Sequence, residues 1–132
     1  MGTVKYLLDT HTLLWLVRGS KELSNTAKTA LNDTSVQKYV SAVSAYEIMY
    51  KHKLGKLHGF KDIAENYLDV LQKIGTEELP ISTQHAHFAG KFEWTHRDPF
   101  DRLLAAQAAT DGLTLITNDP AFQELSWIKV LW

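Results

Sequence analysis

Short apolar runs alternate with longer segments of helical periodicity along this chain, and that alternation restricts its fold more than any other feature. The first apolar run, Val4–Leu8, ends at a charged residue, as expected of a buried strand. Parallel strands are joined by long crossovers, usually helices, so this alternation predicts a parallel sheet covered on both faces. We therefore expect residues 1–132 to form a single α/β domain, a three-layer α/β/α sandwich around a central parallel sheet.

Local patterns give the expected bounds of each element. Ser24 is a suitable N-cap for the helix that follows it. Gly75 closes a long apolar stripe whose helical spacing predicts one helix over Phe60–Ile74. The expected strands are Val4–Leu8, Lys38–Val43, Glu77–Ile81, Leu113–Thr117 and Trp127–Leu131, and the expected helices are Thr10–Val17, Ser24–Asn32, Ala45–Lys53, Phe60–Ile74, Ser82–Phe92, Phe100–Ala109 and Pro120–Leu125.

Composition excludes several classes of protein. The chain has no cysteine, which removes disulfides, thiolate catalysis and cysteine-based zinc sites. Its formal net charge is −1, from 14 basic and 15 acidic side chains, so a nucleic-acid role must rest on a local basic patch or on metal ions. The longest apolar run, Leu13–Val17, is far too short to cross a membrane, and the charged N-terminus does not resemble a secretory signal. We expect a cytoplasmic protein.

Acidic residues follow the expected strands or begin the helices after them. Asp9 follows the first strand, Glu47 lies in the helix after the second, and Asp119 follows the fourth. Asp98 and Asp101 stand at the start of the most helix-prone segment. In open parallel sheets, ligands bind beyond the carboxyl ends of the strands, so these acids are candidates for one common site.

Each acid also has a purely structural explanation. An aspartate before a helix is a common N-cap, and Asp98 and Asp119 each precede a proline at the first helical position. Glu47 stands at capping-box spacing from Ser44 and at ion-pair spacing from Lys51.

The expected meeting of all these acids at one edge of the sheet favours a functional interpretation. Several carboxylates that meet at one edge repel one another unless a cation lies among them. Oxygen-rich sites of this kind suit Mg²⁺ or Mn²⁺. Such a site supports hydrolysis of a phosphodiester, because a metal ion lowers the pKa of a bound water and neutralises charge on the phosphate.

Four short segments, spread over the whole chain, carry the acids: Leu7–Thr10, Ser44–Ile48, Asp98–Ala108 and Leu115–Asp119. In order and separation they resemble the motifs of PIN-domain ribonucleases, and most closely those of the VapC-like toxins of bacterial toxin–antitoxin pairs. One such motif is a weak signal, whereas four in order are a specific one.

The resemblance implies a PIN-like α/β/α fold and cleavage of single-stranded or looped RNA that depends on Mg²⁺ or Mn²⁺. It implies a catalytic set of Asp9, Glu47, Asp101 and Asp119, in which the aspartates bind metal and Glu47 holds or deprotonates the attacking water. Asp101 is preferred to Asp98 because it lies just before the Leu-Leu-Ala-Ala run, and Asp98 is left as an N-cap or an outer metal ligand. A homodimer and a cognate antitoxin that covers the site are also implied.

Other residues near these motifs have two interpretations each. Thr10 and Thr117 either orient carboxylates or form turns, and Asn118 either contacts phosphate or forms a turn. Arg97 and Arg102 either contact the scissile phosphate or pair with the neighbouring acids. Most histidines are expected at the surface or as satisfied core residues, with His11 and His96 nearest the site.

Two larger groups are equally ambiguous. A basic cluster after the Glu47 helix either grips RNA phosphates or is a solvated helix end. The aromatic residues are expected mainly in the core, and any exposed ones could stack bases or line a partner groove. The basic cluster is Lys51, His52, Lys53, Lys56, His58 and Lys61, and the aromatic residues are Trp15, Tyr46, Tyr50, Trp94, Trp127 and Trp132.

Two other function classes stay open: a catalytically silent binding module of the same fold, and a receiver-type phosphoacceptor domain. The clustered acids argue against the first, because a scaffold has no need of them. A receiver domain requires an adjacent acidic pair after the first strand, where Asp9 is followed by Thr10. A haloacid-dehalogenase-type phosphatase requires a second aspartate where His11 stands. A metal-dependent endoribonuclease is therefore the leading prediction.

Overall fold

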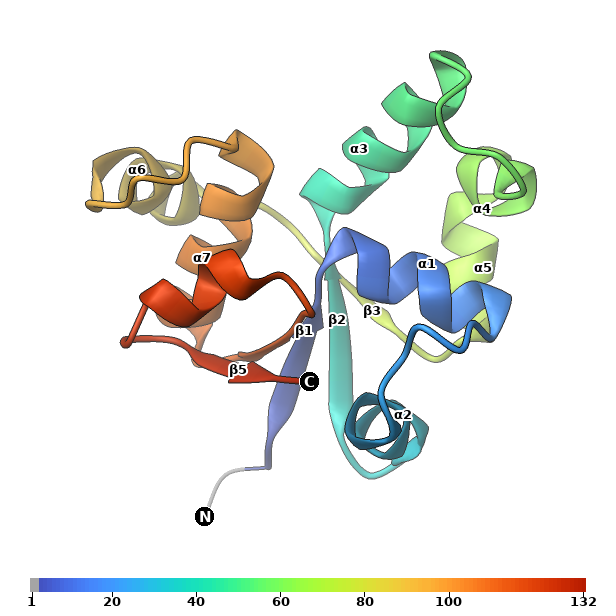
Figure 1. The fold of residues 1–132 in the computed structure, drawn as a ribbon, viewed down its shortest axis with the longest axis horizontal. Coiled ribbons are helices and arrows are strands. Elements are labelled where there is room, and N and C mark those ends of the chain that lie inside the picture. The colour runs from blue at the N-terminus through green and yellow to red at the C-terminus, as the bar shows by residue number, and fades with distance from the viewer. Residues whose placement is uncertain (1–2) are drawn as a thin grey trace.

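The fold is built on a sheet whose strands all run in the same direction, as the alternation of elements predicts. A computed structural model describes residues 3–132, and in this part the strand order is β3-β2-β1-β4-β5, with every neighbouring pair parallel (Figure 1). The strands are β1 (Lys5–Leu8), β2 (Gln37–Ser41), β3 (Glu77–Leu79), β4 (Thr114–Ile116) and β5 (Lys129–Leu131).

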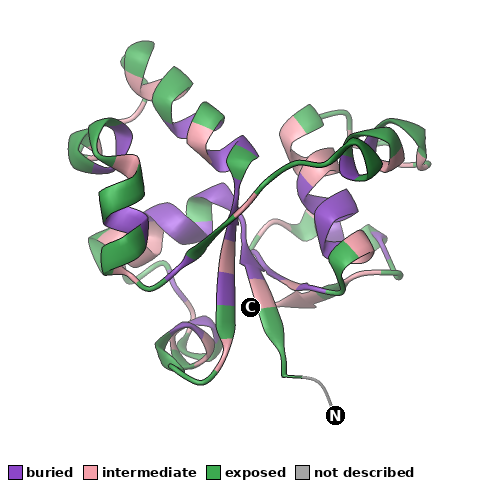
Figure 2. Ribbon diagram, turned by 180° about the vertical axis from the view of Figure 1, so that it is seen from behind, coloured by how far each residue is buried: buried purple, intermediate pink, exposed green. Residues whose placement is uncertain are grey.

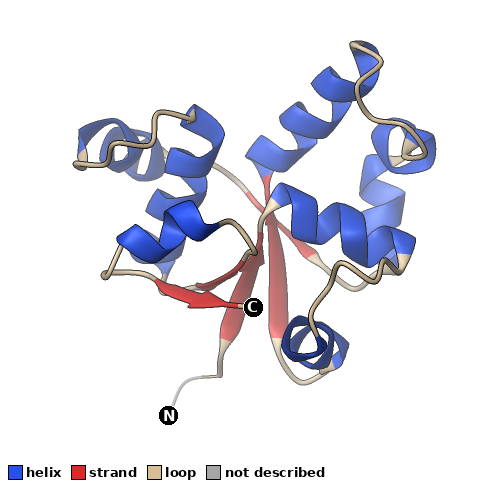
Figure 3. Cartoon of the chain, in the orientation of Figure 1, coloured by secondary structure: helices blue, strands red, loops and turns tan. Residues whose placement is uncertain are grey.

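Helices cover both faces of this sheet, which confirms the three-layer α/β/α prediction (Figure 3). On one side lie α1, α2, α4 and α5, and on the other lie α6, α7 and the 3₁₀ helix η1 (Figure 1). The helices are α1 (Thr10–Arg18), α2 (Asn25–Asn32), α3 (Ala42–Lys53), α4 (Lys61–Glu65), α5 (Tyr67–Lys73), α6 (Thr83–Lys91), α7 (Pro99–Asp111) and η1 (Pro120–Glu124).

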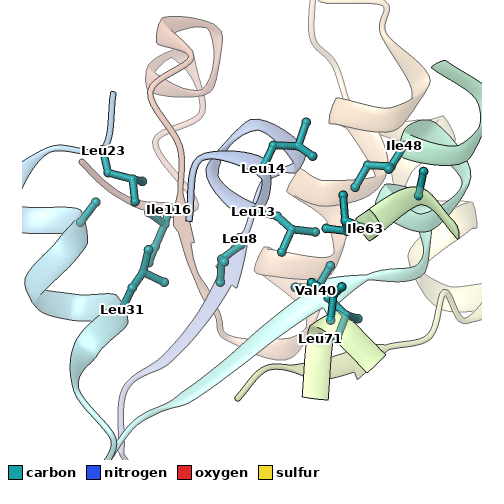
Figure 4. Close-up of a cluster of buried hydrophobic side chains, with 13 residues drawn as sticks. Leu8, Leu13, Leu14, Leu23, Leu31, Val40, Ile48, Ile63, Leu71 and Ile116 are labelled. Carbon is teal, nitrogen blue, oxygen red and sulfur yellow. The ribbon is translucent and has the colours of Figure 1, made fainter. Parts of the chain in front are cut away.

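The alternation of side chains along each strand separates two apolar cores. Leu8 and Ile116 face a cluster formed with α1, α2, α4 and α5, shown in Figure 4. Their neighbours Leu7 and Leu115 face the opposite cluster, formed with α7 and η1. Figure 2 shows that burial is concentrated on the central strands and on the helix faces turned toward them. The sheet edge beyond the strand ends is therefore held rigidly from both sides.

One expected helix is wrong in its extent. The stripe over Phe60–Ile74 forms two helices, α4 and α5, because Asn66 leaves the helical region with φ −122° and ψ 45°. Its side-chain amide donates to Asp62 Oδ1 at 2.9 Å, a local bond of the kind by which asparagine competes with helix continuation. The apolar spacing persists across the break, so periodicity alone did not reveal it.

A second difference concerns the boundary between β2 and α3. The strand ends at Ser41, which caps α3 through its side chain, so the helix begins at Ala42 and the expected strand over Lys38–Val43 is too long. The proposed capping box of Ser44 and Glu47 is consequently wrong, since both residues lie inside the helix.

The strand register brings the carboxyl ends of β1, β2 and β4 to the same edge of the sheet. Leu8 pairs with Val40 of β2 and with Ile116 of β4, so the residues after these strands leave the sheet at the same edge. Figure 1 shows the first turns of α1 and α3 rising from this edge. Within the described residues, no helix combines the length and the apolar character that a membrane crossing requires.

Candidate active site

Asp9 is fixed by two hydrogen bonds at the carboxyl end of β1. Its Oδ1 accepts from the Thr12 backbone N–H at 2.7 Å, which caps α1. Its Oδ2 accepts from the Thr117 hydroxyl, which confirms that Thr117 orients a carboxylate. Burial raises the pKa of Asp9, against the lowering effect of these hydrogen bonds. The capping and functional interpretations of Asp9 are thus compatible, because a cap uses one oxygen and leaves the carboxylate at the sheet edge.

Asp119 lies beside Asp9 and follows β4, the neighbour of β1 in the sheet. Its backbone N–H donates to Thr117 Oγ1 at 3.1 Å, and its Oδ1 accepts from Ala121 N at 3.0 Å as the cap of η1. The two acids line one open cleft of about 260 Å³, together with His11, Trp15, Asn118 and Pro120. The structure therefore brings Asp9 and Asp119 together, as expected of acids that follow adjacent strands.

Asp101 forms a second group at the start of α7. Its Oδ2 lies 2.6 Å from His96 Nε2, and Asp98 caps the helix by accepting from Phe100 N at 2.8 Å. Burial raises the pKa of Asp101 to about 6, helped by the charges of Asp98 and Asp119 and opposed by the bond from His96. The N-cap role expected of Asp98 is confirmed.

Metal-donor atoms come closest together in this second group. His96, Asp98 and Asp101 lie with their donor atoms all within 4.8 Å of one another. Within residues 3–132 this is the one group of three or more histidine, aspartate or glutamate side chains that meets this distance. Asp9 and Asp119 are outside that set, but the charge of Asp119 acts on both Asp101 and His96. Asp119 therefore lines the cleft with Asp9 and acts through its charge on the Asp101 group.

Glu47 is positioned from α3, one turn beyond its connection to α1. Thr10 and Ser44 hydrogen-bond through their hydroxyls at 2.9 Å, which ties the first turns of the two helices together. Thr10 thus holds Ser44 rather than a carboxylate. Glu47 is 9% exposed and its Oε2 accepts from Lys51 Nζ at 2.6 Å, as the sequence spacing predicts. Glu47 belongs to neither of the two acidic groups described above.

Arg102 does not pair with the neighbouring acids, which was one of its two expected roles. Its guanidinium donates to four backbone carbonyls, those of Ala89, Phe92, Trp94 and His96.

 None of the salt bridges within residues 3–132 involves Arg102. Its close ring contact is with Phe92, whose centroid lies 4.3 Å from the Arg102 Cζ atom. Arg102 therefore holds the segment before α7 in place.

The other expected residues divide between the surface and the core. His85 is buried and bonded to Asp111 at 3.0 Å, as expected of a satisfied core histidine. In the basic cluster, Lys51 is paired with Glu47, and His52 lies 3.8 Å from Glu65. The expectation that the aromatic residues lie mainly in the core is wrong for three of them, because Tyr46, Tyr50 and Trp127 are 60%, 50% and 42% exposed.

The chemistry of these donors fits a hard divalent cation. Carboxylate oxygens are the ligands that Mg²⁺ and Mn²⁺ prefer, and the chain supplies them from the β1–α1 junction, α7 and the β4–η1 connection. The raised pKa of Asp101 has burial as its main cause and like charges as a further one. A cation among these carboxylates would relieve that repulsion.

Comparison with known proteins agrees with this fold. The family model of the PIN domain matches residues 6–128. No curated protein matches the chain in sequence. Among solved structures, VapBC2 from Rickettsia felis bound to a promoter DNA fragment aligns with 16% identity over 97% of this chain and 98% of that chain, at a TM-score of 0.70.

Two further structures align over nearly the whole chain. DNA-bound VapBC from Salmonella typhimurium has 24% identity, covers 98% of both chains and gives a TM-score of 0.69. A toxin–antitoxin complex from Klebsiella pneumoniae has 23% identity, covers 96% of both chains and gives a TM-score of 0.68. These structural alignments establish a shared fold.

Proposed function

Because this chain belongs to the PIN domain family, we propose that it is a metal-dependent endoribonuclease that hydrolyses RNA phosphodiester bonds, and the toxin of a toxin–antitoxin pair. One observation carries the proposal: Asp9 and Asp119 share a cleft at the carboxyl edge of the sheet, and the charge of Asp119 also reaches Asp101. Three acids from separate parts of the sequence thus gather where parallel sheets bind their ligands.

Each acid has a proposed role. Asp9, Asp101 and Asp119 would hold Mg²⁺ or Mn²⁺, with Asp98 as an outer ligand. A divalent cation bound there supplies an activated water and neutralises charge on the phosphate. Glu47 holds the attacking water or accepts its proton, using the oxygen that Lys51 does not occupy. Thr117 keeps the Asp9 carboxylate oriented toward the cleft.

The test is cleavage of RNA by purified protein. Single-stranded and hairpin RNAs are incubated with Mn²⁺, with Mg²⁺ or with EDTA, beside an Asp101→Asn variant. Cleavage that requires metal and disappears in the variant supports the nuclease. Folded wild-type protein that cuts none of these RNAs would favour the silent binding module instead.

A protein partner forms the second part of the proposal. The solved structures that align with this chain include VapBC and toxin–antitoxin complexes, which supports a cognate antitoxin here. An apolar groove of about 280 Å³ adjoins the site and shares His11 and Trp15 with the acidic cleft. Arg18, Lys51 and Lys56 line it, which suits a segment with both apolar and acidic side chains.

We further propose a homodimer in the cytoplasm. Exposed apolar side chains on α3, including Tyr46, Met49 and Tyr50, offer a surface for a second copy. Sedimentation of the purified chain tests the dimer, and copurification with the product of a neighbouring antitoxin gene tests the partner. A monomer at micromolar concentration would contradict the dimer without affecting the nuclease.

A further inference from the structure

The segment between α6 and α7 is fixed although it has no regular secondary structure. Residues 92–98 contain neither helix nor strand. Arg102, on the first turns of α7, donates to the carbonyls of Phe92, Trp94 and His96 within or beside this segment. Its guanidinium also stacks on the Phe92 ring, 4.3 Å from Cζ to centroid. The backbone that carries His96 is therefore anchored to the same helix that carries Asp101.

The His96 side chain is held from two directions. Its ring lies 4.7 Å from the Trp94 ring, centroid to centroid, and Trp94 is itself tied to Glu124 by a hydrogen bond of 3.2 Å. Its Nε2 lies 2.6 Å from Asp101 Oδ2. Because an ionised carboxylate has only acceptors, the imidazole is the donor in this bond.

The two oxygens of Asp101 have different surroundings. Oδ2 accepts the His96 bond, whereas Oδ1 accepts no hydrogen bond from the residues that the structure describes. Asp98 and Asp119 both place negative charge near this carboxylate. Without a fixed donor on Oδ2, repulsion would favour rotation of the side chain away from these neighbours.

We propose that His96 is a positioning residue, which fixes the Asp101 carboxylate through Oδ2 and leaves Oδ1 directed to a bound divalent cation. This inference rests on the proposed nuclease function. Loss of a hydrogen bond that orients a metal ligand costs about 10- to 100-fold in metal affinity or activity.

The first test needs neither metal nor RNA. In isotope-labelled protein with EDTA, three-bond couplings report the χ1 rotamer of Asp101. The wild type is expected to show one rotamer, and His96→Ala is expected to show averaging between rotamers. A single unchanged rotamer in His96→Ala overturns the proposal, whatever the activity of the protein.

The second test measures metal binding and catalysis. His96→Ala should weaken Mn²⁺ binding in calorimetry about 10- to 100-fold and lower kcat with little change in KM. His96→Gln retains an N–H donor and should restore most of both values. The control is His87→Ala, which removes an exposed histidine from α6 and should match the wild type.

The outcomes separate this inference from the proposed function. A wild type that binds Mn²⁺ and cuts RNA, with His96→Ala equal to it, overturns only the role of His96. His96→Gln as defective as His96→Ala also overturns it, because the hydrogen bond would then not be the cause. A wild type that neither binds Mn²⁺ nor cuts RNA, with rotamer averaging in His96→Ala, rejects the nuclease and leaves the positioning of Asp101 intact.

Discussion

Asp9 combines a structural and a proposed catalytic role in one side chain. It caps α1 through Oδ1 and receives the Thr117 hydroxyl on Oδ2, and burial raises its pKa. A buried charge opposes folding, whereas the hydrogen bonds to it favour folding. An asparagine at this position would keep the capping oxygen and remove the charge, so it separates the two roles.

Asp9→Asn should abolish cleavage and leave the fold intact. We expect activity to fall more than about 100-fold, because a metal ligand is lost. The free energy of unfolding should either fall by less than about 1 kcal/mol or rise, since asparagine caps helices about as well as aspartate. RNA cleavage and urea denaturation measure the two effects. Asp69→Asn, at an exposed position on α5, is the control for charge.

The raised pKa of Asp101 predicts that the stability of the metal-free protein depends on pH. Its pKa is about 6 in the folded state against 3.8 ordinarily, so the folded state binds more protons between these pH values. The free energy of unfolding contributed by this group therefore falls as the pH rises from 4 to 6. The raised pKa of His96 acts in the same direction at higher pH.

Urea denaturation in EDTA from pH 4 to pH 7 measures this effect. Relative to Asp101→Asn, the wild type should lose about 2 kcal/mol across the range, allowing for partial solvent exposure of the carboxylate. Parallel curves for the two proteins would contradict the assigned environment of Asp101.

At the scale of elements, the start of α7 organises half of the site. Asp98 caps the helix, Asp101 hydrogen-bonds to His96, and Arg102 anchors the preceding segment. Asp101 and Arg102 are adjacent in sequence but point to different partners. The first turn of one helix thus positions both a carboxylate and the loop that presents His96 to it.

Arg102→Ala should destabilise the protein by about 2–4 kcal/mol, because several backbone carbonyls lose a charged donor and Phe92 loses its stacking partner. Chemical denaturation measures the loss. Arg97→Ala, at an exposed neighbouring position, should change stability by less than about 0.5 kcal/mol. Equal effects of the two substitutions would show that the carbonyl contacts contribute little.

Most elements could be predicted from the sequence because each carries a local signal. The cap at Ser24 and the turn at Gly75, with φ 73°, lie where the patterns place helix ends. The break at Asn66 could not be predicted, since the apolar stripe continues across it while a side-chain bond to Asp62 interrupts the helix. The order of the strands in the sheet could not be predicted either, because it depends on crossovers between distant segments.

The candidate site was predictable only where acids follow strands. Asp9 and Asp119 meet because β1 and β4 are adjacent, a fact absent from the sequence pattern. The bond from His96 to Asp101 joins a loop to a helix, and its only sequence signal is the close spacing of the two residues. The carbonyl contacts of Arg102 have no sequence signal, since backbone acceptors are the same in every residue.

At the scale of the whole molecule, two packed helical layers force like charges together at one edge of the sheet. Both cores are closed around β1 and β4, so the acids that follow these strands cannot move apart without disturbing buried leucines. Repulsion among the acids therefore opposes folding in the absence of metal. A cation that binds only the folded state would offset this cost by mass action.

Mn²⁺ should consequently stabilise the whole fold. At a free concentration about 100 times its Kd, the expected gain is about 2.7 kcal/mol, or roughly 10 °C in Tm for a domain of this size. Thermal unfolding with Mn²⁺ and with EDTA measures it, and Ca²⁺ and NaCl at matched ionic strength separate specific binding from screening. The gain should vanish in Asp101→Asn. An equal gain in that variant would mean that the cation acts elsewhere on the surface, and that the gathering of acids at the sheet edge is a consequence of helix capping alone.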